Sequence, residues 1–129
     1  MSWIHQNQEL FNTANTIFKS NFPQLFEEYS KVLLPNRFFG AWITITLNKL
    51  FDTGMSYHID KQDYKKSYCW VLPFGTFSKG FFNIPEIPTK ICLQTRDFLC
   101  FDSHLLHGVE PFIGTRYSLV FFSHSNLFT

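Results

Sequence analysis

The chain has 129 residues, of which 45% are hydrophobic, 19% aromatic and only 16% charged. This length supports one hydrophobic core, so we expect a single domain over 1–129, with helical support in 1–37 and a β core in 38–129. The many large apolar side chains exclude a disordered tail. A net charge of only +1 excludes a protein that holds nucleic acid mainly through a strongly basic surface.

Two amphipathic helices are predicted first. Apolar residues recur at helical spacing over 10–18 and again over 22–33. Asn21 is the expected N-cap of the second helix, Pro23 stands in its first turn, and Pro35 is the expected stop. Neither helix carries a reactive cluster, so both are interpreted as packing elements.

From residue 41 the apolar period changes to that of a strand. Segment 41–50 alternates, with Ile43 and Ile45 on one face and Thr46 and Asn48 on the other. Further short strands are predicted at 57–59, 67–72, 80–84, 90–93, 98–101 and 117–123, separated by turn signals at 52–54, 73–75, 85–88, 96–97 and 113–114. Short strands after two helices predict a mainly β chain of the α+β class, with an antiparallel sandwich or jelly roll as its core.

The three cysteines, Cys69, Cys92 and Cys100, have spacings that match neither a zinc finger nor an even disulfide framework. We expect them to be buried thiols in a reducing compartment. The sequence shows no secretory leader and no run of about 18 apolar residues. These features predict an intracellular protein, nuclear or cytoplasmic, that has no contact with a membrane.

His58-Ile59-Asp60 is the first candidate for chemistry. Because side chains alternate along a strand, His58 and Asp60 point to the same face and can meet one metal ion. A third ligand from a distant strand, either His104 or His107, would leave the opposite coordination positions open, which suits non-haem Fe(II). The motif alone is weak, since Asp60 also reads as an ordinary turn residue.

The last predicted strand carries a second candidate. One face of it presents, in order, Arg116, Ser118, Val120, Phe122 and His124. A lone guanidinium in an apolar strand is costly to bury unless an anion meets it, and a carboxylate matches its planar fork. Two partners for Arg116 are open here: a bound carboxylate, or an internal ion pair with Glu110 or Asp102.

Taken together, these motifs resemble a known family. The series His58-x-Asp60, His107, Arg116-x-Ser118 resembles the 2-oxoglutarate- and Fe(II)-dependent dioxygenases, whose fold is a cupin-like double-stranded β-helix. Segments 71–87 and 107–128 are similar, more narrowly, to the TET and J-binding-protein branch, especially its compact fungal members. The resemblance covers about residues 38–129.

The resemblance implies roles for particular residues. It implies that iron is held by His58, Asp60 and His107. It also implies that Arg116 pairs with the distal carboxylate of 2-oxoglutarate and that Ser118 assists with its hydroxyl. His104 is the rival third ligand, but His107 is followed by Gly and stands nine residues before Arg116, as in the family pattern.

The substrate that the resemblance implies is nucleic acid. The reaction would use O₂ to oxidise the methyl group of 5-methylcytosine, flipped out of the stack, to 5-hydroxymethylcytosine or further. Asp63, Phe122 and His124 match positions that contact the flipped base. An ionised Asp63 accepts hydrogen bonds only, so it suits the amine of cytosine and repels the carbonyl of thymine. Without the resemblance, these three residues read as a solvated turn residue, a core aromatic and a surface residue.

Two other functions remain open from the sequence. The same iron chemistry could act on a protein side chain or a small molecule, which the low net charge permits. Alternatively, the chain could be a non-catalytic jelly-roll binding module in which His58 and Asp60 are incidental.

The chain also departs from the family pattern. Lys79-Gly80 stands where many relatives have two glycines, and we expect this change to alter a turn without touching any ligand. The phosphate-facing groups expected near the site are Lys61, Lys65, Lys66 and Lys79. Because these are few, a strong grip on duplex DNA is not expected.

Overall fold

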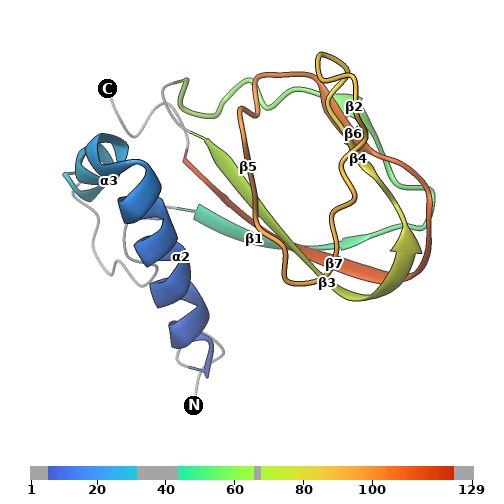
Figure 1. The fold of residues 1–129 in the computed structure, drawn as a ribbon, viewed down its shortest axis with the longest axis horizontal. Coiled ribbons are helices and arrows are strands. Elements are labelled where there is room, and N and C mark those ends of the chain that lie inside the picture. The colour runs from blue at the N-terminus through green and yellow to red at the C-terminus, as the bar shows by residue number, and fades with distance from the viewer. Residues whose placement is uncertain (1–5, 32–43, 66–67, 124–129) are drawn as a thin grey trace.

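The computed structural model describes residues 6–31, 44–65 and 68–123. Two helices precede two antiparallel sheets (Figure 1). The helices are α2 (Gln8–Asn21) and α3 (Pro23–Ser30). The large sheet has the order β1-β7-β3-β5, with bounds Thr44–Leu50, Phe112–Phe122, Cys69–Lys79 and Leu99–Phe101. The small sheet has the order β2-β6-β4, with bounds Met55–His58, His107–Val109 and Phe82–Asn83. This arrangement confirms the predicted fold class.

The boundary between the helices differs from the prediction. Asn21 is the last residue of α2 and donates its side-chain amide to the Ile17 carbonyl, so it is not the N-cap of α3. Phe22 separates the helices with an extended φ of −136°, and Pro23 begins α3, where its missing N–H is not needed. The expected stop, Pro35, lies outside the described residues.

The helices pack on the outer face of the large sheet, as Figure 1 shows. Phe18 of α2 meets Trp70 of β3 edge-on with ring centroids 5.9 Å apart, and Phe11 meets Phe121 of β7 at 6.5 Å. The buried members of this cluster are Phe11, Ala14, Phe18, Tyr29, Trp70, Leu72, Leu119 and Phe121. The helices are therefore packing elements, as their amphipathic pattern predicts.

The opposite face of the large sheet packs against the small sheet. This second core joins side chains of both sheets and of the segment between β4 and β5: Cys69, Val71, Phe82, Ile84, Leu93, Phe101 and Val109. Successive residues of β7 thus serve different layers. Leu119 and Phe121 face the helices, whereas Val120 and Phe122 face the small sheet.

Strands β3 and β7 run through two predicted turns. Pro73 is paired with Ser118 inside the long β3·β7 ladder, and Gly114 is paired with Phe77. The carbonyl of Pro73 accepts a bond from Arg96 N at 3.1 Å, on the side away from β7, where the pairing of β5 with β3 has ended at Val71. The missing N–H of the proline therefore breaks no ladder bond, and the strand continues.

One further strand prediction was wrong, and one strand was not predicted. Segment 90–93 forms only an isolated bridge, between Ile91 and Phe82. Strand β6, which the sequence analysis did not recognise, occupies His107–Val109 at the centre of the small sheet. Three residues are too few to show an alternating pattern.

The cysteines are free thiols in different environments. Cys69 on β3 is buried and Cys100 on β5 is half-buried, but Cys92 is exposed, which corrects the expectation that all three are buried. Burial raises the pKa of the Cys100 thiol to about 12. Among the described residues, no helix is both long and apolar enough to cross a bilayer.

Candidate active site

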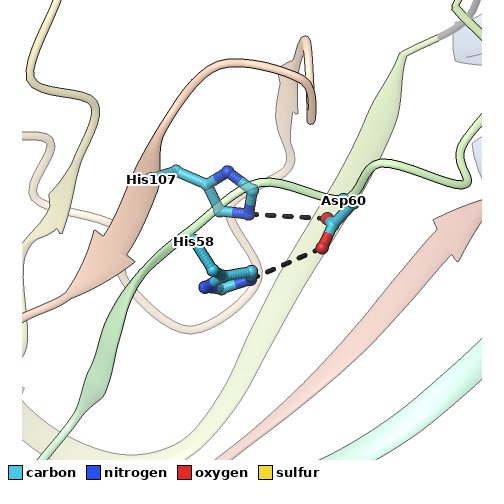
Figure 2. Close-up of side chains that lie close together, drawn as sticks. All are labelled: His58, Asp60 and His107. Atoms are coloured by element: carbon cyan, nitrogen blue, oxygen red, sulfur yellow. Dashed lines mark ion pairs between the residues drawn. The ribbon is translucent and has the colours of Figure 1, made fainter.

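Strand pairing brings together the three side chains of the predicted iron site. His58 ends β2 and lies directly opposite His107, the first residue of β6, while Asp60 follows two residues after β2. One ligand atom from each residue lies within 4.8 Å of the other two. Figure 2 shows both rings turned toward the carboxylate of Asp60, with 3.5 Å from each Nε2 to a carboxylate oxygen. Two nitrogens and one oxygen thus converge on one point.

Backbone carbonyls orient both imidazole rings. His58 Nδ1 lies 2.9 Å from the Ser56 carbonyl, and His107 Nδ1 lies 2.7 Å from the Leu105 carbonyl. Because a carbonyl can only accept, the proton of each neutral ring is on Nδ1 and the lone pair is on Nε2. In the neutral form of each ring, Nε2 is therefore the atom that can ligate a metal.

Asp60 and His107 of the triad shift each other's pKa. Burial raises the pKa of Asp60, but the hydrogen bond that the protonated ring of His107 donates and the positive fields of His107, His58 and His104 outweigh it, so the pKa lies below its usual value. Burial lowers the pKa of His107, but its bonds to Asp60 and Leu105 and the fields of Asp60 and Asp63 outweigh it, so this pKa is raised. The carboxylate is thus held ionised, ready to meet a cation.

His104, the rival third ligand, is not part of this cluster. Its Nδ1 and its backbone N both face Asp102 Oδ1, at 3.3 and 2.9 Å. Among the described residues, the side chain that joins His58 and Asp60 as a third possible metal ligand is His107, not His104.

A cavity of about 650 Å³ opens between the two sheets beside the triad. Its walls include the triad, Cys69 and Val71 of β3, Thr46, Asn48 and Leu50 of β1, and Arg116, Ser118, Val120 and Phe122 of β7. Asn48, which the sequence analysis left without a role, pairs in register with Ser118 and lines the same cavity.

Arg116 is the buried cation of this cavity. It is 1% exposed, its guanidinium carbon lies 4.6 Å from the centre of the Phe77 ring, and burial lowers its pKa. Its Nη1 donates to the Gly80 carbonyl at 2.6 Å, but its Nε has no hydrogen-bond partner within 6–31, 44–65 and 68–123. Among the described residues no carboxylate forms an ion pair with it, and the two partners that the sequence offered are paired elsewhere: Glu110 with Lys90 and Asp102 with His104. An unpaired buried guanidinium is costly, so the cavity suits an anionic ligand.

The Lys79-Gly80 turn reaches this site through Gly80. Lys79 and Gly80 both have left-handed backbones, with φ of 64° and 72°, and the Gly80 carbonyl holds the guanidinium of Arg116. A Cβ at position 80 would lie 2.5 Å from Arg116 Nη1. The turn therefore positions a residue predicted to bind the cosubstrate.

The predicted base-contacting residues have different environments. Asp63 is 7% exposed and lines the cavity, so it is not a solvated turn residue. Its Oδ2 accepts a bond from the Ser103 hydroxyl at 2.6 Å. Phe122 lines the cavity and also packs against the core between the sheets. His124 lies outside the described residues.

The sequence analysis missed Ser103 and the role of Gly80. Ser103 stands in an unremarkable stretch before His104, and no pattern links it to Asp63, 40 positions earlier. For Gly80, the sequence did offer a signal. A glycine directly after a strand can adopt the left-handed backbone that ends strand pairing.

Two of three comparisons with known proteins find a similar protein. No protein-family model matches the chain. Over 103 residues it is 29% identical to the bifunctional helicase and thymine dioxygenase JBP2 of Trypanosoma brucei brucei, covering 78% of this chain and 9% of that protein. The structure of NgTET1 in complex with 5mC DNA matches with a TM-score of 0.83 at 17% identity, covering 95% of this chain and 50% of the other. The chain thus spans a small part of the curated relative and half of the solved one.

These matches confirm the resemblance to the TET and J-binding-protein branch of the 2-oxoglutarate- and Fe(II)-dependent dioxygenases. The chain has the double-stranded β-helix fold of NgTET1, and its described residues include two N-terminal helices. Within that fold, His58, Asp60 and His107 form a constellation consistent with the iron site of such dioxygenases.

Proposed function

We propose that the chain is an Fe(II)- and 2-oxoglutarate-dependent dioxygenase that oxidises the methyl group of 5-methylcytosine in nucleic acid. The observation that carries the proposal is the convergence of the His58–Asp60–His107 triad and the unpaired guanidinium of Arg116 on one cavity. The cavity then offers ligands for a metal cation, from the triad, and a positive charge for a dicarboxylate, from Arg116.

The residues present suit both missing partners. Two neutral Nε2 atoms and one ionised carboxylate form a facial set for Fe(II). Arg116 would hold the distal carboxylate of 2-oxoglutarate through its free Nε, with the Ser118 hydroxyl beside it. When bound, iron and 2-oxoglutarate supply the oxidation of a C–H bond by O₂.

The protein's own contribution is placement and exclusion of water. The Ser56 and Leu105 carbonyls fix the ring orientations, so the ligands need little rearrangement when the metal arrives. Burial of Arg116 among aromatic rings strengthens its attraction for a carboxylate, because the local dielectric is low. The apolar walls Val71, Val120 and Phe122 shield the reacting methyl group from water.

The two relatives differ in the base that their names state, so thymine is the second candidate substrate. The buried carboxylate of Asp63 favours 5-methylcytosine. A carboxylate accepts a hydrogen bond from the N4 amine of cytosine, whereas thymine presents the O4 acceptor at that position. His124 and Phe122 are proposed to contact the pyrimidine edge and face of the same base.

The test is mass spectrometry of oligonucleotides incubated with the chain, Fe(II), 2-oxoglutarate and O₂. Single- and double-stranded oligonucleotides carry 5-methylcytosine or thymine, and Asp60→Ala is the control. We expect the 5-methylcytosine oligonucleotide to gain the mass of one oxygen atom, with succinate formed alongside. Succinate without a modified oligonucleotide would favour a protein or small-molecule substrate. Neither product from protein that binds both cofactors would favour a binding module.

A further inference from the structure

One serine is hydrogen-bonded to both acidic residues of the cavity. Ser103 is 2% exposed and stands just after β5. Its carbonyl accepts the backbone N–H of Asp60 at 2.9 Å, and its hydroxyl donates to Asp63 Oδ2 at 2.6 Å. The backbone N of Asp63 bonds in turn to the Asp60 carbonyl at 3.1 Å. The loop that carries both carboxylates is thus clamped against a single residue.

The two bonds of Ser103 come from different parts of the residue. The carbonyl that holds the Asp60 backbone is present in every amino acid. The hydroxyl that holds the Asp63 carboxylate is present only while the residue is serine or threonine. Substitution by alanine therefore separates the two contacts: it keeps the support of the metal ligand and removes that of Asp63.

The hydroxyl also determines which way the Asp63 carboxylate faces. A short bond from a buried hydroxyl to a carboxylate is among the stronger hydrogen bonds, and it holds Oδ2 at a defined position on the cavity wall. Without it Oδ2 loses the contact that fixes its position, so the direction of the carboxylate lone pairs toward the cavity changes. Discrimination between an amine and a carbonyl depends on that direction.

We propose that Ser103 is a positioning residue for substrate choice: through its hydroxyl it aims the Asp63 carboxylate at the exocyclic group of the pyrimidine. This inference rests on the proposed function and adds a determinant of base preference to it. Ser103 itself touches neither the metal nor the base.

The chain offers a matched control at the other side of the same loop. Ser123 is also fully buried, and its carbonyl accepts the backbone N–H of Tyr64 at 2.8 Å, as the Ser103 carbonyl accepts that of Asp60. Among the described residues, its hydroxyl has no hydrogen-bond partner. Ser123→Ala therefore removes the same atom from an equally buried serine without touching Asp63.

The experiment measures the ratio of oxidised 5-methylcytosine to oxidised thymine when both oligonucleotides compete for the full chain with Fe(II), 2-oxoglutarate and O₂. We expect Ser103→Ala to lower this ratio about tenfold or more, the range for loss of a hydrogen bond to a charged group. Ser123→Ala should leave the ratio unchanged. Mn(II) affinity should stay within about threefold of the parent chain in both variants, because both keep the backbone carbonyl.

A second measurement separates positioning from general damage. If Ser103 acts through Asp63, Ser103→Ala should no longer change the ratio in an Asp63→Ala background. A Ser103→Ala chain that loses activity on both bases equally, or keeps the parent ratio, would overturn the inference while leaving the proposed function intact. A parent chain that oxidises neither base would overturn both.

Discussion

His58 and His107 lie directly opposite each other on β2 and β6, with ring centroids 4.4 Å apart. The ladder of the small sheet brings the two imidazoles together. Since Asp60 is tied to Ser103 by its backbone, all three ligand side chains are supported by backbone hydrogen bonds. A site held in this way is organised before its metal binds.

Removal of one triad member should abolish metal binding. Asp60→Ala leaves two imidazoles without the anionic ligand, so Mn(II) or anaerobic Fe(II) should no longer raise the melting temperature. In the parent chain, a metal at 100 times its Kd should add about 2.7 kcal/mol to the free energy of unfolding. Asp102→Ala is the control, because Asp102 pairs with His104 outside the triad. Equal metal-induced shifts in both variants would exclude the triad as the site.

Above about pH 6.5, metal affinity should rise with pH while the stability of the metal-free chain falls. In the metal-free chain, protonated His107 stabilises the fold because its pKa is raised there. This contribution is complete below about pH 6.5, the ordinary pKa of histidine, and is lost as the pH rises through the raised pKa of the folded chain. Ionised Asp60 stabilises the fold because its pKa is lowered there. This contribution is complete above about pH 3.8, the ordinary pKa of aspartate, and is lost as the pH falls through the lowered pKa of the folded chain. The pair thus contributes most between these two values.

A metal must displace the proton from His107, so metal affinity should rise with pH through the raised pKa of that residue. Titration calorimetry with Mn(II) at several pH values measures this rise, and thermal unfolding of the metal-free chain measures the stability. Asp60→Asn should flatten the stability profile over the same window. A metal affinity that is constant between about pH 6 and pH 8 would contradict the assigned role of His107.

Gly80→Ala should weaken the binding of 2-oxoglutarate. The new Cβ would lie 2.5 Å from Arg116 Nη1 at a φ of +72°, so the guanidinium must move and the backbone is strained. We expect a loss of about 1–2 kcal/mol in the free energy of unfolding. The affinity for 2-oxoglutarate should fall about tenfold while Mn(II) affinity is kept.

Lys79→Gly is the matched control for that turn. Lys79 also has a left-handed backbone, with φ of 64°, and glycine adopts it without strain. This variant should bind 2-oxoglutarate as the parent chain does, measured by calorimetry in the presence of Mn(II). If Gly80→Ala also binds normally, the Gly80 carbonyl does not position Arg116.

The helices should be essential to stability. Phe18 of α2 is fully buried against Trp70 and Tyr29, so Phe18→Ala should cost about 3–5 kcal/mol in urea unfolding. Phe51→Ala, at a ring that is 82% exposed, should change stability by less than about 0.5 kcal/mol. Similar effects of the two substitutions would show that α2 does not pack as described.

Much of the site could be predicted from local pattern and resemblance, but its assembly could not. Strand alternation predicts that His58 and Asp60 share a face, and the structure brings them together. Their approach to His107 depends on β6, whose three residues carry no periodic signal. The clamp from Ser103 to Asp63 joins residues 40 positions apart, and such contacts follow from the register of the whole fold.

The turn signals misled for a different reason. Proline and glycine usually end strands, yet Pro73 and Gly114 lie within the longest ladder of the protein. Pro73 is tolerated because its backbone nitrogen, which has no hydrogen to donate, faces away from β7. Glycine is required at position 114 because a Cβ there would collide with the Thr76 carbonyl on the neighbouring strand. Only the position of each residue relative to its partner strand shows this.

The most direct test of the central claim is an anaerobic titration of the chain with Fe(II) and then 2-oxoglutarate, followed by visible absorption spectroscopy. The account predicts a weak charge-transfer band that appears only when both are present, is lost in Asp60→Ala, and needs higher 2-oxoglutarate in Arg116→Ala. A well-folded parent chain without this band, or a band with the same 2-oxoglutarate dependence in all three proteins, would contradict the claim that this cavity is a 2-oxoglutarate-dependent iron site.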